Sequence, residues 1–489
     1  MLVRLRSVDT TVQTQICAGW VFSSPPSSLA DAVQYRVSLV KEMSAAVTRV
    51  VQKWPLLAGK GVWLKEENIL GIDVPSPDAL PDKLFTLTQA TVDSPYPVSE
   101  PLSARPSGFQ GIPTRNHFQD LNVPLTLLGL AKKGMPLLAL RFTFFTDAVA
   151  FGITMPHQIF DGTGAAVVVQ AMNAELWNEP WTPPPVYEQN PMAAAIAALP
   201  PPHPGELPAD YETVLAPGGP AGIFKVLLRC LWEKYAWQGG EETYLFLRRA
   251  AVERLVRKVK EEVRAMTGGK EYVSTSDVLT AWIYKTTDSH KGSSSATQEA
   301  QGVFASRKVL STPDRDLEAY PFNAILPYYL FDPPVAFSEY PFISLAELAL
   351  RHRRSVIRFR TKPVVAALER DVVSVPRIPR RELPLPWPLS MSRFNGQAAT
   401  RETSSRCLWN NLDCDFANLR LPDLAQHADS KGWRPLPLVM FHFFVLIPFT
   451  PDHSLVMHQL DEGYIIFGSM RPEVRKAFEA AAEKLDQDQ

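Results

Sequence analysis

Apolar residues recur every three or four positions in three segments of the chain, which is the spacing of an amphipathic helix. The first segment ends before Pro55, the second ends at Gly268-Gly269, and the third begins at Pro472, a residue suited to a first helical turn. We therefore predict three long helices whose apolar faces carry Val33, Val37, Val40, Met43, Val47, Val50 and Trp54 in the first, Val252, Leu255, Val256, Val259, Val263 and Met266 in the second, and Val474, Phe478, Ala481 and Leu485 in the third.

Other segments alternate apolar and polar or small residues, which is the period of a strand. Residues 140–144 and 149–155 alternate on either side of Thr146-Asp147, and residues 438–447 and 464–467 form later strands. Strands and helices mix without a regular βαβ rhythm. The pattern therefore predicts an α+β or mixed α/β fold.

Prolines mark where the chain passes between lobes. Twelve prolines fall between residues 180 and 220, and such a stretch is unsuited to a helix or a central strand. We predict an N-terminal lobe over 1–185, a crossover linker over 186–220 and a C-terminal lobe over 221–489. A second proline-dense stretch lies within 365–400, which we expect to return to the N-terminal lobe.

Charge and composition narrow the class of protein. The 489 residues include 50 basic and 51 acidic side chains, for a net charge of −1, which argues against a nucleic-acid partner because phosphate contacts need clustered basic residues. The hydrophobic share of 46% and the charged share of 21% are typical of a globular chain.

Three further features indicate a cytoplasmic protein without a membrane span. The most apolar segment, Leu436–Phe449, is too short to cross a bilayer and contains His442. The first residues lack the apolar run of a secretory signal. The cysteines form no paired framework and are expected to be reduced thiols: Cys17, Cys230, Cys407 and Cys414.

The candidate chemistry lies between Ile153 and Trp177. A strand runs into Pro156-His157, a tight segment closes on Asp161-Gly162, and an apolar helix follows. His157 is thus placed at the carboxyl end of a strand, where a neutral imidazole is suited to take a proton from a hydroxyl or an amine. Two other interpretations remain open at this point. His157 is a core histidine with Asp161 as a helix N-cap, or the pair binds a metal, for which the other His and Cys residues show no ligand spacing.

The motif belongs to an ordered set. Its segments are, in chain order, Trp54-Pro55-Leu56-Leu57-Ala58-Gly59-Lys60, the HxxxDG residues His157, Asp161 and Gly162, the stretch Ser274-Thr275-Ser276-Asp277-Val278-Leu279-Thr280-Ala281-Trp282, the segment Ser306-Arg307-Lys308, Phe322-Asn323-Ala324, and Asp415-Phe416-Ala417-Asn418-Leu419. With this set the chain resembles the BAHD-type acyl-CoA-dependent acyltransferases, and more particularly their fungal branch, over nearly its whole length.

Departures from the family pattern make the chain a divergent member of that set. The family's DFGWG motif is degenerate here, because only Asp415 and Phe416 match it. The aspartate that the family carries before its arginine is replaced by Ala305 or Ser306.

The resemblance implies a fold and a reaction. The fold is α/β, with two similar lobes of mixed sheets and flanking helices, like chloramphenicol acetyltransferase, and an active-site channel between the lobes. The reaction moves an acyl group from acyl-CoA to a hydroxyl or amine of a bulky secondary-metabolite acceptor, with His157 as general base and Asp161 orienting its loop. Acyl-CoA is a co-substrate, and no permanently bound cofactor or metal is expected.

The resemblance also implies supporting residues. Gly162, Arg307 and Asp415 would support the site, with Arg307 holding the aspartate of the motif by a charge-assisted bond. The hydroxyls of Thr403, Ser404 and Ser405 are candidates for the oxyanion or acyl site, or else solvated loop residues. Ser274 and Ser276 are weaker candidates for cofactor binding.

Three alternatives stay open from the sequence. The donor is bound to a carrier protein, as in condensation domains, although those domains double the histidine and here Pro156 precedes it. The enzyme catalyses a donor-free cyclisation or elimination. The chain is a catalytically silent binder of a hydrophobic ligand, which the presence of His157 argues against. A monomer is expected.

Overall fold

The computed structural model of the protein describes most of the chain, with gaps. Everything below concerns the described residues, which are 1–5, 15–23, 29–67, 69–96, 106–109, 115–124, 126–187, 190–203, 205–207, 241–289, 297–298, 301–314, 316–374, 407–410, 438–442, 454–459, 462–470 and 472–487.

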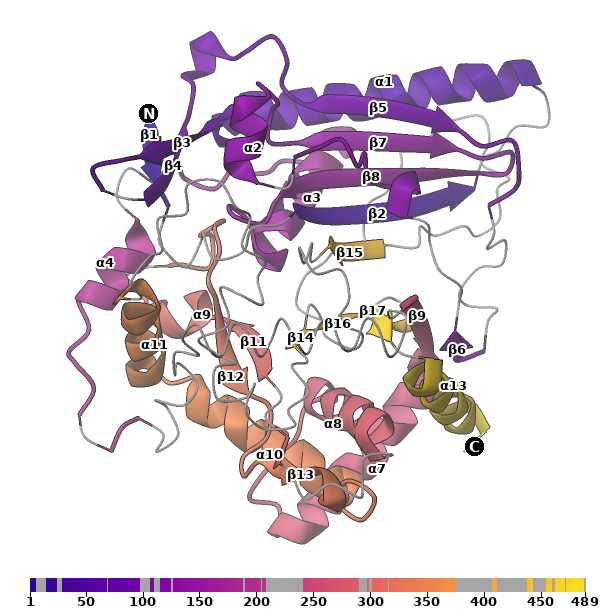
Figure 1. The fold of residues 1–489 in the computed structure, drawn as a ribbon, viewed down its shortest axis with the longest axis vertical. Coiled ribbons are helices and arrows are strands. Elements are labelled where there is room, and N and C mark those ends of the chain that lie inside the picture. The colour runs from indigo at the N-terminus through magenta and orange to yellow at the C-terminus, as the bar shows by residue number, and fades with distance from the viewer. Residues whose placement is uncertain are drawn as a thin grey trace, which may run out of the picture.

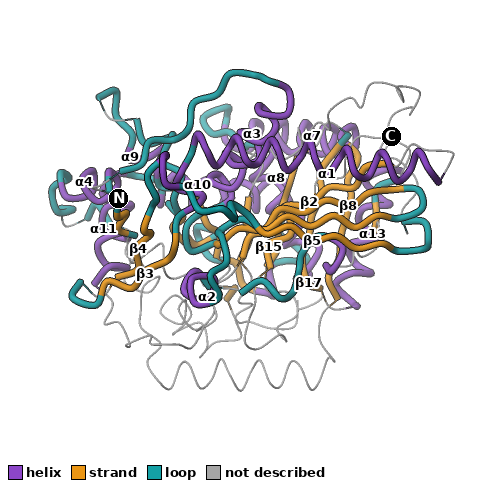
Figure 2. The backbone as a smooth tube through the Cα atoms, turned by 90° about the horizontal axis from the view of Figure 1, so that it is seen from above, coloured by secondary structure: helices purple, strands orange, loops and turns teal. Residues whose placement is uncertain are grey.

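A five-stranded mixed sheet forms the upper part of the molecule in Figure 1. Its strand order is β15 (Leu438–His442), β2 (Gln15–Ser23), β8 (Ala148–Pro156), β7 (Ala139–Phe144) and β5 (Thr86–Thr91). All nine residues of β8 are buried. The helices α1 (Leu29–Lys53) and α3 (Gly162–Trp177) pack against each other and lie on the same side of the strands in Figure 2. A central strand covered in this way holds whatever follows its last residue in a defined place.

A seven-stranded mixed sheet forms the second half. Its order is β12 (Ile325–Tyr329), β11 (Gln301–Ala305), β14 (Cys407–Asn410), β16 (Ser454–Gln459), β17 (Gly463–Met470), β9 (Glu241–Arg248) and β6 (Gly108–Phe109). Its helices lie in the lower part of Figure 1, and they are α7 (Arg249–Thr267), α8 (Thr275–Asp288), α10 (Leu345–Phe359) and α13 (Pro472–Gln487).

The two large sheets exchange strands. β15, from late in the chain, pairs with β2 of the first sheet, and β6, from early in the chain, pairs with β9 of the second. Beside β6, the backbone N–H of Ser107 donates to the Asp486 carboxylate of α13 at 2.6 Å. Each half therefore completes its sheet with a strand from the other end of the chain, and the lobe boundaries expected from the sequence stay predictions.

Smaller elements complete the fold. Two further sheets have the orders β1-β4-β3 and β10-β13. The remaining elements are β1 (Leu2–Arg4), β3 (Lys60–Leu64), β4 (Ile69–Asp73), β10 (Thr297–Gln298), β13 (Val335–Ala336), α2 (Leu127–Lys132), α4 (Pro191–Ala197), α9 (Arg307–Leu310), α11 (Lys362–Ser374), and the 3-10 turns η1 (Pro55–Ala58), η2 (Pro77–Ala79), η4 (Arg115–His117) and η6 (Phe337–Glu339).

The three predicted long helices are confirmed as α1, α7 and α13. Gly268 ends α7 in the left-handed conformation, with φ of 60°, which is why a glycine follows the last turn. The predicted apolar faces are partly wrong, because Val33, Val37 and Met266 are 53%, 57% and 52% exposed. Other residues of the same two helices are buried in the core. A regular apolar spacing therefore predicts a helix but does not show which of its turns other elements pack against.

The prediction of no helix in the proline-rich stretch is wrong. α4 (Pro191–Ala197) forms there, with Pro191 in the first turn, where its missing N–H is not needed. The side chain of Asn190 caps it by accepting from the N–H groups of Met192 and Ala193. After Pro191 no proline occurs before Pro200, so a short helix fits there.

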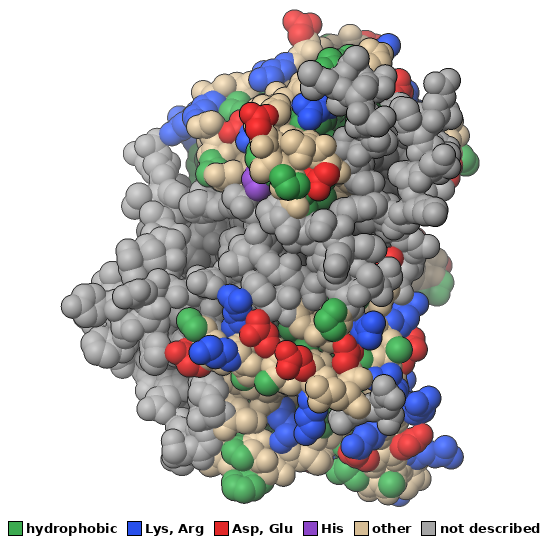
Figure 3. Space-filling model, turned by 90° about the vertical axis from the view of Figure 1, so that its right-hand side faces the viewer, with side chains coloured by type: hydrophobic (Ala, Val, Ile, Leu, Met, Phe, Trp, Pro, Cys, Tyr) green, Lys and Arg blue, Asp and Glu red, His purple; other side chains and the backbone are tan. Residues whose placement is uncertain are grey.

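No described helix is long and apolar enough to cross a membrane. The fold prediction of two α/β halves with mixed sheets and flanking helices is confirmed. Among the described residues on the face that Figure 3 shows, basic and acidic side chains are interspersed.

Candidate active site at the β8–α3 turn

The candidate catalytic residues occupy the short connection between β8 and α3. The N–H groups of Ile159 and Phe160 both donate to the carbonyl of Pro156, which closes a tight turn. Asp161 then caps α3, because its Oδ1 accepts from the backbone N–H of Gly164 at 3.0 Å. Gly162, whose role in the site stays a prediction, is the first residue of the helix. The N-cap interpretation of Asp161 is therefore confirmed, and it describes only one of the two carboxylate oxygens.

The second oxygen of Asp161 binds residues from the other half of the molecule. Its Oδ2 accepts from Arg307 Nη2 at 2.6 Å and from the backbone N–H of Ala324 at 3.1 Å. The same Nη2 donates to the carbonyl of Phe322 at 2.8 Å. Arg307 and Asp161 are only 2% and 1% exposed, so solvent screens this charge-assisted pair little. The ion pair ties the β8–α3 turn to the segment that follows β11.

The backbone of His157 is held by the same segment. Asn323 Nδ2 donates to the carbonyl of His157 at 2.5 Å, and the Asn323 N–H donates to the carbonyl of Ile159 at 3.0 Å. Gly164 permits this approach, since a Cβ there would lie 2.0 Å from the carbonyl oxygen of Pro321. The turn is thus fixed on both sides by the chain around residue 323.

The imidazole of His157 is fully buried. Burial lowers its pKa below the ordinary 6.5, although the nearby Asp161 carboxylate acts in the opposite direction. A ring with a lowered pKa is neutral near pH 7, which is the protonation state of a general base. The active-site channel expected between the lobes stays a prediction.

Sequence reasoning missed two residues that shape the turn. Asn323 lay inside a matched segment but received no role, and Gln158 lay inside the HxxxDG motif. The Oε1 of Gln158 accepts from the N–H of Leu127 at 2.5 Å, which anchors the turn to the start of α2. The match of Asn323 to a family segment could have indicated its role. Nothing in the sequence indicates that Gln158 binds the N–H of Leu127.

Other predicted site residues lie elsewhere or are not described. Thr403, Ser404, Ser405 and Asp415 lie outside the described residues. Ser274 and Ser276 lie at the start of α8. Ser274 takes part in a capping box, where its N–H and hydroxyl donate to Asp277 Oδ2 at 2.6 and 2.7 Å. The roles proposed for these residues in binding stay predictions.

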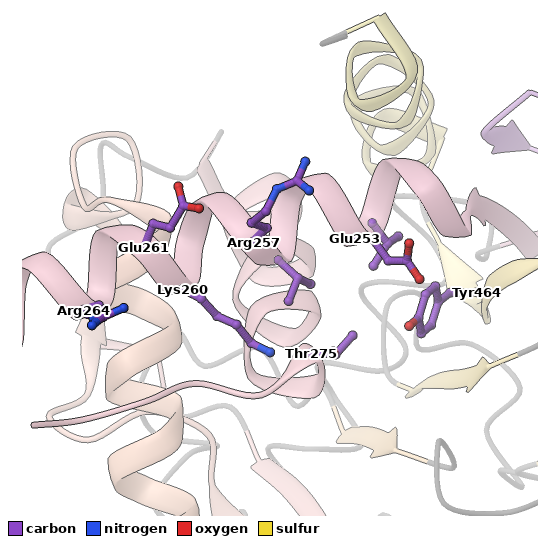
Figure 4. A pocket seen from close by; sticks show the side chains of 9 residues that line it. Glu253, Arg257, Lys260, Glu261, Arg264, Thr275 and Tyr464 are labelled. Carbon is purple, nitrogen blue, oxygen red and sulfur yellow. The ribbon is translucent and has the colours of Figure 1, made fainter. Parts of the chain in front are cut away.

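A pocket of about 420 Å³ lies between α7, the start of α8 and β17. Figure 4 shows the Lys260 side chain extending from α7 toward the side where Thr275 lies, with the Glu253 carboxylate close to the Tyr464 ring. Arg257 and Arg264 of α7 also line it. Three basic side chains (Arg257, Lys260 and Arg264) and two acidic ones (Glu253 and Glu261) therefore line this pocket.

The arginines of α10 are occupied by acidic neighbours. Arg351 pairs with Glu339 at 3.0 Å, Arg354 with Glu271 at 2.8 Å, and Arg358 with Asp332 at 2.8 Å.

Among the described residues, no group of three or more His, Cys, Asp or Glu side chains could hold a metal ion.

A second buried histidine joins α8, α10 and β12. His352 Nδ1 is 2.7 Å from Asp277 Oδ1, and His352 Nε2 is 3.0 Å from the Tyr328 hydroxyl. Burial raises the pKa of Asp277, but the bonds from His352 and Ser274 outweigh that effect, so this pKa lies below its ordinary value. The ionised carboxylate only accepts hydrogen bonds, which places the proton on Nδ1.

Comparisons with known proteins agree with this fold. The structure of F. sporotrichioides TRI101 with coenzyme A and T-2 superposes with a TM-score of 0.60 at 13% identity, over 98% of this chain and 97% of that one. Vinorine synthase gives 0.52 at 13% identity, over 99% and 93%. The first condensation domain of the CDA synthetase gives 0.52 at 14% identity, over 100% and 97%. The chain therefore has the two-lobed fold shared by these proteins.

Two curated proteins match parts of the sequence. The transcriptional regulator calD of Penicillium decumbens is 29% identical over 56% of this chain and 55% of its own length. Fumigaclavine B O-acetyltransferase ifgI of Penicillium roqueforti (strain FM164) is 28% identical over 32% of each chain. The chain therefore spans about half, or less, of the length of these relatives. No protein-family model matches it. The acetyltransferase and the solved structures support the resemblance to the BAHD-type acyltransferases.

Proposed function

We propose that this protein is an acyltransferase that moves an acyl group from an acyl-CoA thioester to a hydroxyl or amine of a bulky, largely apolar small molecule. The observation that carries the proposal is the buried imidazole of His157, whose pKa is lowered by burial, on a turn held by Asp161, Arg307 and Asn323. The fold shared with a solved complex of coenzyme A supports it, as does the sequence match to an O-acetyltransferase.

The reaction needs one base and no acyl-enzyme. The neutral ring of His157 accepts the proton of the acceptor as its oxygen or nitrogen attacks the thioester carbonyl. The carbon–sulfur bond then breaks, and the imidazolium returns the proton to the departing thiolate. Asp161 takes no proton in this scheme, because both of its oxygens accept hydrogen bonds from Gly164, Arg307 and Ala324. Its role is to hold the turn, and so to hold the ring in place.

A fully buried base also implies a conformational change. The acceptor atom must come within hydrogen-bonding distance of the His157 ring, yet that side chain is 0% exposed. We therefore infer that substrate binding opens a path to the turn, as loop and domain movements do in many enzymes.

The pocket on α7 is the site that we propose for the phosphates of the acyl donor. Lys260 and Arg257 provide positive charge beside it, and Lys260 extends toward Thr275. Replacing Lys260 with Ala should weaken coenzyme A binding several-fold. Lys258, which lies on the same helix but does not line the pocket, is the matched control. Equal binding by both variants and the wild type would place the donor elsewhere.

The decisive experiment compares the wild type with His157→Ala against a panel of acyl-CoAs. We expect acyl-CoAs to bind to both forms, measured by calorimetry, and the thioester to be consumed only by the wild type in the presence of hydroxylated or aminated acceptors. Consumption of the thioester at the same rate by His157→Ala would remove the general-base assignment.

The same panel distinguishes the other readings. Activity only with an acyl carrier protein would favour the carrier-bound donor, as the fold shared with a condensation domain allows. Turnover of a small molecule without any donor would favour cyclisation or elimination, and ligand binding without turnover would favour a silent binder. The net charge of −1 provides no excess of positive charge for nucleic acid, so it does not favour for this chain the regulatory role that the name of calD gives to that protein.

A further inference from the structure

A second acidic residue lies close to the candidate active site and was not suggested by any motif. Glu369 belongs to α11 (Lys362–Ser374) and is 1% exposed. Its Oε1 is 3.1 Å from the hydroxyl of Ser306, which is fully buried and directly precedes Arg307. A carboxylate removed from water in this way needs hydrogen-bond donors, and Ser306 is one of them.

Ser306 stands between the two groups that bind Asp161 Oδ2. The first is Arg307, the next residue in the chain. The second is the backbone of Ala324, whose carbonyl accepts from the Ser306 N–H at 2.6 Å and whose N–H donates to Asp161 at 3.1 Å. A shift of Ser306 would therefore displace both donors together.

The Ser306 hydroxyl has one proton and two acceptors within reach, the Ala324 carbonyl at 3.0 Å and Glu369 Oε1 at 3.1 Å. The Ala324 carbonyl already accepts from the Ser306 N–H. A carboxylate is also the stronger acceptor. The hydroxyl proton therefore goes to Glu369.

The neighbouring residue makes α11 a firm support for this bond. Arg370 Nη2 donates to the carbonyls of Ile196 and Leu199 at 3.0 and 2.5 Å, at the C-terminal end of α4. Glu369 thus contacts Ser306, the residue before Arg307, while Arg370 contacts the end of α4. The contacts of Arg370 hold α11 in place independently of Ser306.

We propose that Glu369 is a positioning residue of the candidate active site, acting through Ser306 to hold Arg307 and the Ala324 backbone against Asp161. The inference rests on the proposed function.

The first test is kinetic. Glu369→Ala should lower kcat by about 100-fold, the cost of a small misplacement of catalytic groups, with KM unchanged. Glu369→Gln should retain most of kcat, because its amide oxygen still accepts from Ser306. The matched control is Glu175→Ala, which removes another buried carboxylate, one that pairs with Arg49 and Lys53 on α1. This control should lower the melting temperature and leave kcat unchanged.

The second test needs no substrate. The ring resonance of His157, assigned by its loss in His157→Gln, is followed against pH by NMR. Glu369→Ala should move the midpoint of this titration, because Asp161 shifts relative to the ring, whereas Glu175→Ala should not.

Two results would overturn the proposal. One is a titration midpoint of His157 that is unchanged in Glu369→Ala. The other is a loss of activity in Glu369→Ala and in Glu175→Ala that is fully explained by the smaller fraction of folded protein. If the wild type consumes no thioester, the proposed function fails and the titration alone decides the role of Glu369.

Discussion

Each of two buried histidines in this protein lies near a carboxylate, and the two carboxylates make different hydrogen bonds. In the first arrangement Asp277 Oδ1 is 2.7 Å from Nδ1 of His352, and the Tyr328 hydroxyl is 3.0 Å from Nε2 of the same ring. At the β8–α3 turn the Asp161 carboxylate instead binds Arg307 and two backbone N–H groups. The first arrangement uses both ring nitrogens to join three elements. The second holds the backbone that carries the ring.

The comparison separates a structural imidazole from a candidate base. A histidine whose two nitrogens bind protein partners has a fixed tautomer and orientation, and it joins α8, α10 and β12. His157 is held through its backbone carbonyl by Asn323 and has its pKa lowered by burial. A ring with a lowered pKa is neutral near pH 7, which suits a group that takes a proton from a substrate.

The largest expected effect comes from removing the candidate base. His157→Ala should lower kcat by about 10²–10⁴-fold, the usual contribution of general acid–base catalysis. The melting temperature, followed by circular dichroism, should change little by comparison. An activity within a few-fold of the wild type would make the two histidines alike in function.

The next largest effect tests the ion pair. Asp161→Asn keeps an oxygen that caps α3 but leaves Arg307 buried without a carboxylate, which should cost about 3–5 kcal/mol of unfolding free energy. Urea unfolding measures this loss, and kcat should fall with it because the turn loosens. Asp120→Asn, at a carboxylate outside this cluster, is a control in which little should change. Full stability in Asp161→Asn would show that the ion pair does not anchor the turn.

A smaller effect is expected at the second histidine. His352→Gln retains a polar group but loses at least one of the bonds to Asp277 and Tyr328, which should cost about 1–3 kcal/mol of unfolding free energy. Since this ring is structural, kcat per folded molecule should stay at the wild-type value. A loss of kcat without a loss of stability would contradict the division between the two sites.

The smallest effect is a difference in pH dependence. His157 has a folded pKa below 6.5, so the unfolded chain binds the proton more readily. Above pH 6.5 the titration of His157 therefore leaves the free energy of unfolding unchanged. As the pH falls below 6.5, it lowers that free energy, with a slope of at most about 1.4 kcal/mol per pH unit. Asp277 has a folded pKa below 3.8, so its stabilisation is present above pH 3.8 and is lost below it.

Urea unfolding of His157→Gln against the wild type measures the first of these windows. The variant should show a flatter slope just below pH 6.5. The difference between the two proteins is the informative quantity, because burial also lowers the pKa of His117. Parallel curves would mean that His157 titrates alike in the folded and unfolded chains.

Much of the local structure was predictable from the sequence. The helices α1, α7 and α13 and the strands β7 and β8 follow from apolar spacing, because that spacing determines which faces can be buried. The cap at Asp161 followed from its place before a glycine and an apolar helix. The helix α4 was not predictable from proline density, because Pro191 occupies its first turn and no proline follows before Pro200.

Apolar spacing along the chain predicted three long helices and the strands β7 and β8, and it placed His157 at the end of a buried strand. The groups that surround this histidine could not be predicted in that way, because they depend on the tertiary structure. Arg307, Ala324 and Asn323 reach the turn through the packing of the two halves, and Glu369 reaches Ser306 from a separate helix. Local propensity acts over a few residues, whereas these contacts join groups far apart in the chain and depend on how the sheets and helices pack.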